Sequence, residues 1–279
     1  MKRYLFYFFL LLTSSAAWAQ PSSPKGNLFI IGGGTRSPAL IKEMVETAGL
    51  QKKDYIVVLP MASAEPVESY AAIQKQLQAV TKNKITCFNF TPATVLNKKW
   101  LDSLRQAKLI FITGGSQDRF MQVVHNSPVY TAIHAAYAGG ATIAGTSAGA
   151  AVMSKYMITG QQLAGDTTYK ETFDKLWDKN IEFKPGLALL DSVIIDQHFI
   201  KRSRYARLFS ALAAFPSFDC VGIDEGTALV VLPGRMKVVG DSQVIHFSEP
   251  KGLQTTPQGL IKVQDMKISI YADGDYFSF

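Results

Sequence analysis

Ala141-Thr-Ile-Ala-Gly-Thr-Ser-Ala-Gly-Ala150 is the segment from which we interpret the rest of the chain. Small and β-branched residues lead into the pentapeptide Gly145–Gly149, and good helix formers follow as far as Lys155. Strand, sharp turn and helix is the setting in which a G-x-S-x-G sequence forms a nucleophile elbow. We therefore interpret Ser147 as a candidate nucleophile. The alternative interpretation is a tight strand-to-helix turn with no chemical role.

The two glycines that flank the serine fit the elbow for a steric reason. The serine sits on a strained turn, where a side chain at Gly145 or Gly149 would collide with the neighbouring strand or helix. The turn lifts the serine hydroxyl beyond the end of the sheet and aims backbone N–H groups at the same point. Those N–H groups can stabilise an oxyanion there.

Apolar strands alternate with helices along the first half of the chain. Strands are predicted at Asn27–Ile31, Tyr55–Leu59, Ile85–Phe90, Leu109–Ile112 and immediately before the elbow. Helices are predicted at about Pro38–Ala48, Pro66–Val80, Lys99–Arg105, Asp118–Val124 and Val129–Ala138. This alternation favours a mainly parallel sheet with helices on both faces, so the predicted fold class is α/β.

Glycine-rich or polar residues follow three of these strands, at Gly32–Gly34, Gly114–Gln117 and Gly145–Gly149. In open α/β sheets, ligands bind at these carboxyl ends of the strands. The Gly32–Gly34 loop lacks the third glycine of a dinucleotide fingerprint, and no acidic residue ends the second strand. We therefore exclude a Rossmann nucleotide site.

The pattern loosens after Ile158. The polar stretch Thr159–Pro185 has no clean period and is interpreted as a long surface loop over the site. Further elements are predicted as strands at Leu187–Leu190 and Val193–Ile195, a helix from about Arg202 to Ala214, and two strand-like runs within Val221–Leu232. The remainder reads as a small C-terminal β appendage. We assign residues 27–235 to one α/β domain and residues 236–279 to a β extension of it.

The first 19 residues have the pattern of a cleavable signal peptide. Lys2 and Arg3 precede an apolar run at Tyr4–Leu12, and Ala17-Trp-Ala19 resembles a cleavage site. The alternative, a membrane anchor, needs about 20 apolar residues, and this run is shorter. We therefore expect a periplasmic or secreted protein with no stable membrane anchor after cleavage.

Composition argues against several classes of function. The 29 Lys and Arg residues outnumber the 22 Asp and Glu residues, for a net charge of +7, but they form no long basic run. Nucleic-acid binding is therefore disfavoured. No Cys/His cluster has metal-ligand spacing, and we expect neither a metal nor a cofactor. Cys87 and Cys220 lie in apolar runs, so both a disulfide and two buried free thiols remain open.

A serine nucleophile needs a histidine within hydrogen-bonding distance and a carboxylate behind it. His198 follows a buried strand and lies among polar residues, whereas His125 and His134 fall on predicted helices and His246 lies in the C-terminal β region. We therefore interpret His198 as the base rather than as a structural histidine.

Four residues are candidates for the acid. They are Glu225, Asp224, Asp196 and Asp166. Strand alternation would place Asp196 and His198 on one side, where Asp196 could instead face the substrate. Glu225 ends a separate apolar run, which a further strand would bring to the same rim of the sheet. Its alternative role is that of a plain turn residue before Gly226.

Four motifs together resemble the cyanophycinase family of serine peptidases, which also contains the aspartyl dipeptidase peptidase E. They are Thr113-Gly-Gly-Ser-Gln117, Gly145-Thr-Ser-Ala-Gly-Ala150, Ile195-Asp-Gln-His-Phe199 with the arginines that follow, and Gly222-Ile-Asp-Glu225 with Thr227 and Ala228. The resemblance runs from about Leu28 to Val231 in matching order. It implies a flavodoxin-like fold similar to class I glutamine amidotransferases, with serine in place of their cysteine.

The resemblance also implies roles for individual residues. The triad would be Ser147, His198 and Glu225, with Asp166 as the alternative acid because the peptidase E branch has its acid between serine and histidine. The oxyanion would be bound by the backbone N–H groups of Gly115 and Ala148. The residues that match pocket positions of cyanophycinases are Gln117, Asp196, Gln197, Arg202, Arg204 and Arg207.

The implied reaction is acyl transfer to serine followed by hydrolysis of the acyl-enzyme. Cyanophycin is a polyaspartate chain with arginine on its side-chain carboxyls, and the family cleaves it to β-Asp-Arg dipeptides. Arginine side chains suit aspartyl carboxylates because they can donate two parallel hydrogen bonds. We expect a peptide or polymer substrate rich in aspartate and arginine. The alternatives are an aspartyl dipeptidase of the peptidase E kind and a non-catalytic binding protein, and a homodimer is left open.

Overall fold

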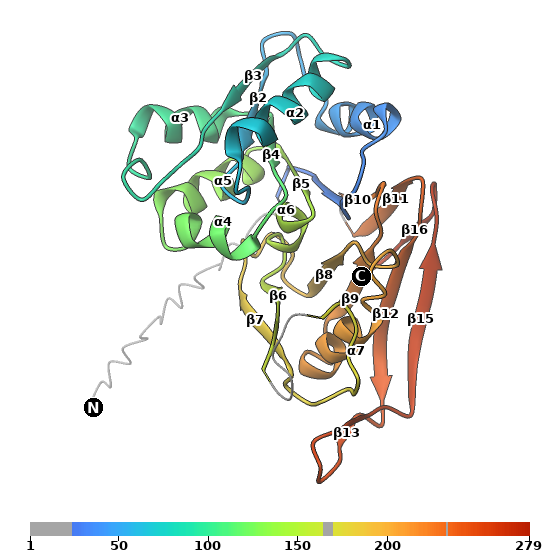
Figure 1. The fold of residues 1–279 in the computed structure, drawn as a ribbon. Coiled ribbons are helices and arrows are strands. Elements are labelled where there is room, and N and C mark those ends of the chain that lie inside the picture. Colours follow the sequence, from blue (N-terminus) through green and yellow to red (C-terminus); the bar gives the residue numbers. More distant parts are fainter. Residues whose placement is uncertain (1–23, 164–169, 233) are drawn as a thin grey trace, which may run out of the picture.

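The computed structural model describes residues 24–163, 170–232 and 234–279 (Figure 1). The signal peptide expected at residues 1–19 and the alternative acid Asp166 lie outside the described residues. No helix in the described ranges is long and apolar enough to span a bilayer.

The main sheet has eight strands in the order β16-β11-β10-β1-β5-β4-β2-β3. Its parallel part consists of β1 (Leu28–Ile31), β5 (Thr142–Thr146), β4 (Leu109–Ile112), β2 (Tyr55–Leu59) and β3 (Lys84–Cys87). All of these strands except the edge strand β3 are buried and mostly apolar, as expected where helices cover both faces of a sheet. The predicted α/β class with a mainly parallel sheet is confirmed.

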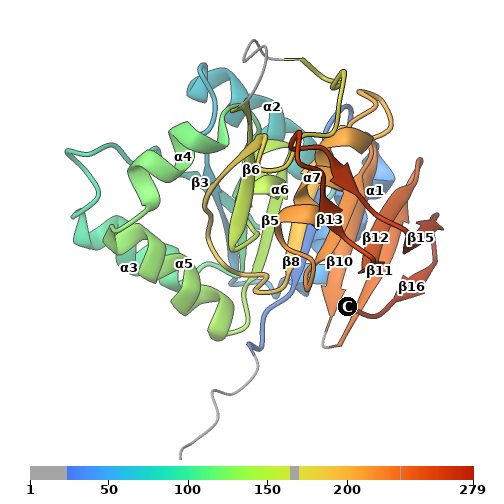
Figure 2. The same cartoon turned by 90° about the horizontal axis from the view of Figure 1, so that it is seen from below.

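Five helices cover the two faces of the parallel part. Helices α1 (Pro38–Ala48) and α2 (Pro66–Gln78) pack on one face. Helices α3 (Lys98–Gln106), α4 (Gln117–Val124) and α5 (Pro128–Ala138) pack on the other. Figure 2 shows these last three helices together on one side of the molecule, with the C-terminal strands on the opposite side.

Local sequence fixes where the first helix begins and ends. The Ser37 hydroxyl accepts a hydrogen bond from the Leu40 N–H at 3.2 Å, and Pro38 stands at the first helical position. Gly49 ends the helix in the left-handed conformation, at φ 58°. Alternate residues of β1 then point to the two helical layers, Leu28 and Ile30 to one and Phe29 and Ile31 to the other.

A second, four-stranded sheet has the order β15-β12-β9-β8. Strands β8 (Val193–Gln197) and β9 (Asp219–Ile223) are parallel, and β12 (Val244–Lys251) and β15 (Asp265–Tyr271) are antiparallel to their neighbours. Helix α7 (Tyr205–Ala214) packs against β9 and β12 in a separate apolar core. The turn at residues 224–226 leads from β9 into β10 (Thr227–Leu232), which pairs with β1, so this turn joins the two sheets.

The C-terminal strands are part of both sheets. Strands β11 (Arg235–Gly240) and β16 (Tyr276–Phe277) extend the main sheet, whereas β12 and β15 extend the second one. Among the described C-terminal residues, the short hairpin of β13 (Gln254–Thr255) and β14 (Ile261–Lys262) projects from the body (Figure 1). The residues expected to form an appendage therefore complete the edges of the core sheets.

The structure corrects four expectations about the second half of the chain. The ends of the stretch expected to be a loop form an antiparallel pair, β6 (Tyr156–Gln162) and β7 (Ile181–Pro185). Helix α6 (Ala148–Ala151) has only four residues and does not continue to Lys155. Residues 187–190 form no strand. Helix α7 begins at Tyr205, not near Arg202.

Tertiary hydrogen bonds explain these differences. The carbonyls of Val152 and Met153 accept hydrogen bonds from the N–H groups of residues 187, 189 and 190, so the apolar run there packs against the end of α6. Within the described residues, its pairing is limited to a single β-bridge between Leu190 and Ser154. Residues 198–204 form turns, in which the Arg204 N–H donates to the Phe199 carbonyl at 3.0 Å. Ser203 has φ 51°, outside the helical region, which delays the start of α7.

The two cysteines are free thiols. Cys87 ends β3 in the main sheet, and Cys220 lies on β9 in the second sheet. Burial raises the pKa of both thiols, that of Cys87 to about 11. Neither thiol is therefore ionised at neutral pH, which makes both poor nucleophiles.

Candidate active site

Ser147 stands on the predicted elbow between β5 and α6. Its backbone has φ 54° and ψ −111°, a strained conformation for a residue with a side chain. Its N–H donates to the Ile31 carbonyl at 3.0 Å, which ties the turn to β1. A Cβ on Gly145 would overlap the Gly149 carbonyl, and one on Gly149 would overlap the Ile112 carbonyl of β4. The expected steric need for both glycines is confirmed.

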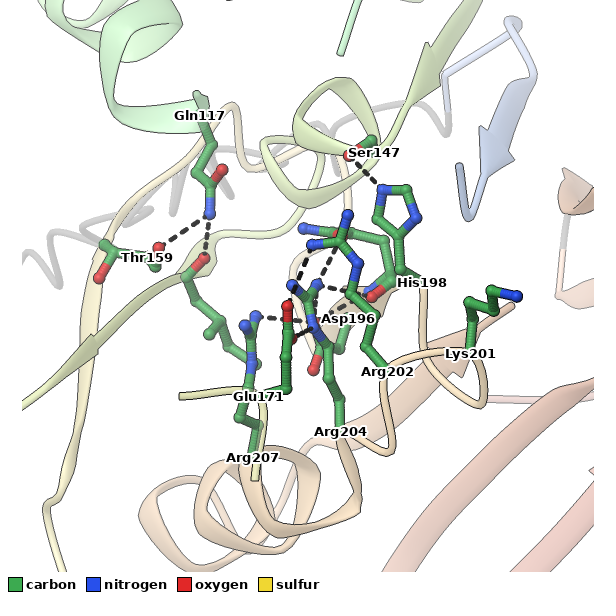
Figure 3. Close-up of polar contacts among 12 residues, drawn as sticks. Gln117, Ser147, Thr159, Glu171, Asp196, His198, Lys201, Arg202, Arg204 and Arg207 are labelled. Carbon is green, nitrogen blue, oxygen red and sulfur yellow. Dashed lines mark hydrogen bonds and ion pairs between the residues drawn. The ribbon is translucent and has the colours of Figure 1, made fainter. Parts of the chain in front are cut away.

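His198 reaches Ser147 from the second sheet. It follows β8 directly, with φ 50°, and its N–H donates to the Gly32 carbonyl at 2.8 Å. Its Nε2 lies 2.8 Å from Ser147 Oγ (Figure 3). The nucleophile candidate and the base candidate thus come from different sheets and meet where the sheets join.

Glu225 completes the chain of contacts from the turn between β9 and β10. Its Oε1 lies 2.6 Å from His198 Nδ1. Because an ionised carboxylate only accepts hydrogen bonds, this contact places a proton on Nδ1 and leaves Nε2 free to accept the serine proton. The arrangement has the order of groups that activates a serine hydroxyl.

The other acid candidates among the described residues have different partners. Asp224 accepts hydrogen bonds from the Lys201 N–H at 2.9 Å and from the Ser242 hydroxyl at 2.8 Å. Asp196 is fully buried and pairs with Arg207 at 2.8 Å. Within the described parts of the chain, Glu225 is therefore the acid candidate that contacts the imidazole.

Burial keeps the His198 imidazole neutral. Desolvation is the main effect and lowers the pKa of His198 below its ordinary value of 6.5, whereas the hydrogen bond to Glu225 raises it. The positive charges of Arg202 and Arg204 lower the pKa further. A neutral imidazole at neutral pH is the form that can act as a base.

The Gly32–Gly34 loop holds the histidine and the glutamate in place. A Cβ on Gly33, which has φ 122°, would overlap the His198 imidazole. A Cβ on Gly34, at φ 68°, would lie 2.7 Å from the Glu225 side chain. The sequence placed this loop among the strand ends where ligands bind and excluded a nucleotide role, but its packing against His198 and Glu225 was not predicted. The signal was present as three consecutive glycines at the end of a strand.

Two backbone N–H groups near Ser147 are available to a ligand. In the described ranges, neither the Gly115 N–H nor the Ala148 N–H donates a hydrogen bond to another residue. A Cβ on Gly114 would lie 3.4 Å from the Cβ of Ser147, so the loop after β4 borders the serine. Gly115 has φ 133° and packs tightly on the Ala62 carbonyl, which fixes this loop. These are the two groups that the sequence suggested for an oxyanion hole.

The polar residues around the site differ in how exposed their side chains are to a ligand. Arg204 donates from Nη1 to both the backbone carbonyl and the Oε1 of Gln197, at 2.8 and 2.7 Å. Arg207 pairs with Asp196. All four residues are buried. By contrast, the Arg202 side chain is 40% exposed, so Arg202 is the arginine of the three that is open to solvent.

Gln117 links two elements at the edge of the site. Its side-chain amide donates to the carbonyls of Ile158 and Thr159, at 2.9 and 3.1 Å (Figure 3). Gln117 is the first residue of α4, and its contacts tie the start of that helix to β6. The two backbone carbonyls therefore fix the orientation of the Gln117 side chain beside the site.

Glu171 is a residue of the site that sequence reasoning missed. Its carboxylate accepts hydrogen bonds from Arg202 Nη1 at 3.3 Å and from Arg204 Nε at 2.9 Å (Figure 3). It comes from the polar stretch between β6 and β7, where no periodicity marks one acidic residue above another. Among the described residues, no group of His, Cys, Asp and Glu is arranged to hold a metal ion.

Comparisons with known sequences point to one family. The family model described as Peptidase family S51 matches residues 28–239. A cyanophycinase of Nostoc sp. (strain PCC 7120) is 31% identical over 281 residues, which cover 96% of this chain and 90% of the relative. A cyanophycinase of Synechococcus elongatus is 28% identical over 274 residues, which cover 93% of this chain and 81% of the relative.

Solved structures share the fold. A peptidase from an acI-B1 Actinobacterium has a TM-score of 0.67 at 22% identity, covering 92% of this chain and 98% of that chain. A putative peptidase E from Listeria monocytogenes EGD-e has a TM-score of 0.52 at 16% identity, covering 78% and 99%. These likenesses show the same arrangement of sheet and helices.

Proposed function

The chain belongs to peptidase family S51, and we propose that it hydrolyses aspartyl peptides with a catalytic triad of Ser147, His198 and Glu225. Membership of the family and similarity to cyanophycinases make the protein a serine-type peptidase. The observation that carries the triad is the continuous chain of contacts, 2.8 Å from Ser147 Oγ to His198 Nε2 and 2.6 Å from His198 Nδ1 to Glu225.

The proposed reaction begins with attack by Ser147 Oγ on a peptide carbonyl. His198 Nε2 takes the serine proton, and Glu225 stabilises the resulting imidazolium through Nδ1–H. The N–H groups of Gly115 and Ala148 donate to the oxyanion of the tetrahedral intermediate. His198 then protonates the leaving amine. In the second step His198 Nε2 takes a proton from water as the water oxygen attacks the ester carbonyl of the acyl-enzyme. The imidazolium then returns that proton to Ser147 Oγ as the ester bond breaks and the acid product leaves.

The substrate class follows from charge at the site and from the named relatives. The curated relatives are cyanophycinases, so a peptide polymer is the first candidate. Arg202 supplies an exposed guanidinium near the triad, which suits an aspartyl carboxylate. We propose that the substrate is a β-Asp-Arg polymer or a related aspartyl peptide.

We also propose that the protein is exported, because residues 1–19 have the composition of a cleavable signal peptide. An exported enzyme of this kind would act on released polymer or on other extracellular aspartyl peptides. Amino-terminal sequencing of the protein from the periplasm or medium should then find Gln20 as the first residue. A start at Met1 would contradict export by this route.

The experiment that tests the function is hydrolysis of purified cyanophycin, with products identified by mass. We expect β-Asp-Arg dipeptide from the wild type and none from Ser147→Ala. Labelling by a fluorophosphonate is measured in parallel. A labelled Ser147 with no product would reject the polymer as substrate, and release of free aspartate from Asp-X dipeptides would then favour the dipeptidase. No labelling would reject the triad.

A further inference from the structure

The Glu171 carboxylate is bound in the way that a substrate carboxylate would be bound. Its Oε1 takes a hydrogen bond from Arg202 and its Oε2 one from Arg204. Proteins bind anions strongly when two guanidinium groups donate hydrogen bonds to one carboxylate, each to a separate oxygen. The groups that would recognise an acidic substrate therefore already hold an acidic side chain of the chain itself.

The segment that carries Glu171 is held by the C-terminal hairpin. We call residues 170–178 the strap. The Asp178 N–H donates to the Gly259 carbonyl, and the Ile261 N–H donates to the Leu176 carbonyl, both at 2.9 Å. Trp177 forms a β-bridge with Leu260, within the hairpin of β13 and β14. The hairpin that projects from the core sheets thus fixes the C-terminal end of the strap, the segment that carries Glu171.

The Glu171 side chain borders solvent, as does one of its two arginine partners. Its side chain is 36% exposed, so its carboxylate can return to water. Arg202 is also open to solvent. The buried Arg204 keeps its two hydrogen bonds to Gln197 when Glu171 departs. Asp196 differs, because its carboxylate is fully buried against Arg207 and does not border solvent.

We propose that Glu171 is a specificity-determining residue, an internal carboxylate that an acidic ligand must displace from Arg202 and Arg204. Because Glu171 occupies the two arginines in part of the molecules, the apparent affinity for an acidic ligand equals the intrinsic affinity multiplied by the fraction of molecules in which the arginines are free. The inference rests on the proposed function for its substrate, but the exchange itself concerns binding.

The test is binding of succinate, measured by isothermal titration calorimetry and therefore independent of catalysis. The variants are Glu171→Gln, which keeps the shape and removes the charge, and the matched control Asp174→Asn. Asp174 lies on the same strap with a 90% exposed side chain, 3.9 Å from Lys170. A third variant, Trp177→Ala, weakens the attachment of the strap to the hairpin. The full chain is used throughout, and melting temperatures check the fold of each variant.

Removal of the internal competitor should tighten succinate binding by about fivefold or more in Glu171→Gln. Trp177→Ala should shift the dissociation constant in the same direction by less, and Asp174→Asn should leave it unchanged. An unchanged or weaker affinity in Glu171→Gln, or an equal gain in Asp174→Asn, would overturn the proposal. So would weaker binding of argininamide in Glu171→Gln, because Glu171 would then hold a substrate guanidinium.

Failure of this inference can be told apart from failure of the proposed function. Fluorophosphonate labelling of Ser147 is measured on the same preparations and reports the triad alone. Labelled protein with no effect of Glu171→Gln on succinate would reject the exchange and keep the peptidase. Unlabelled protein with tighter succinate binding in Glu171→Gln would reject the triad and keep the exchange.

Discussion

Gly33 lies so close to His198 that a Cβ on residue 33 would overlap the imidazole ring. The contact joins the loop after β1 to the residue that follows β8, and so positions the base across the junction of the two sheets. We expect Gly33→Ala to lower kcat/KM by about 100-fold or more, because a small displacement of a catalytic group has effects of this size. Steady-state kinetics with an aspartyl peptide, or the labelling rate of Ser147, measures it.

The matched control for this variant is Gly49→Ala. Gly49 also has positive φ, at 58°, but a Cβ there would meet no atom within 4 Å. This control should lose about 1 kcal/mol of stability and keep its rate, because left-handed backbone alone carries that cost. Equal rates in Gly33→Ala and the wild type would show that the loop does not position His198.

The identity of the acid can be tested by removing charge at three positions. Glu225→Gln should lower kcat by about 10²- to 10⁴-fold, because the amide cannot stabilise the imidazolium. Asp224→Asn should affect stability rather than kcat, since Asp224 contacts Lys201 and Ser242. Asp166→Asn should leave kcat unchanged. A large loss of kcat in Asp166→Asn alone would transfer the role of acid to that residue.

The pH dependence of Ser147 labelling should follow His198. Burial lowers the pKa of His198 below 6.5, so the rate should remain full at neutral pH and fall only at more acidic pH, as the imidazole gains a proton. Arg202→Gln removes a positive charge that lowers this pKa, so the acid limb should move to higher pH. A limb that moves to lower pH in Arg202→Gln would contradict this electrostatic account.

The buried pair of Asp196 and Arg207 should contribute to stability in a way that an exposed pair does not. Asp196→Asn should lower the free energy of unfolding by about 3 kcal/mol, because it leaves the arginine with a buried charge and a weaker acceptor. The control Asp191→Asn breaks a surface pair with Lys155, where the Asp191 side chain is 83% exposed, and should change little. Urea unfolding of the two variants measures both. Equal losses in the free energy of unfolding would mean that the pair of Asp196 and Arg207 contributes no more to stability than an exposed pair.

Thiol titration tests the state of the two cysteines. Both are free, and burial raises the pKa of each thiol, so reaction with Ellman's reagent should be slow in the folded protein. In denaturant without reductant, two thiols per chain should react at once. No reaction in denaturant would mean that Cys87 and Cys220 are paired.

Much of the fold and of the site could be predicted from local patterns. The alternation of apolar strands with helices gave the parallel sheet, and the cap at Ser37 and the stop at Gly49 gave the bounds of α1. Small residues on both sides of Ser147 indicated the elbow, because the steric reason for them is local. Local patterns failed where hydrogen bonds between residues distant in the chain determine the backbone conformation. The apolar run at 187–190 is an example, because it packs against the end of α6 and forms no strand.

Local sequence patterns specify the helices and strands, the elbow and the set of residues from which a triad could be drawn. Which of these residues meet depends on tertiary packing. Ser147 follows a strand of one sheet and His198 follows a strand of the other, so their 2.8 Å contact depends on how the sheets join. The same holds for Glu171, which reaches Arg202 and Arg204 from a stretch with no periodic pattern. Periodicity records which face of an element is buried, whereas these contacts arise from packing between elements that are distant in the chain.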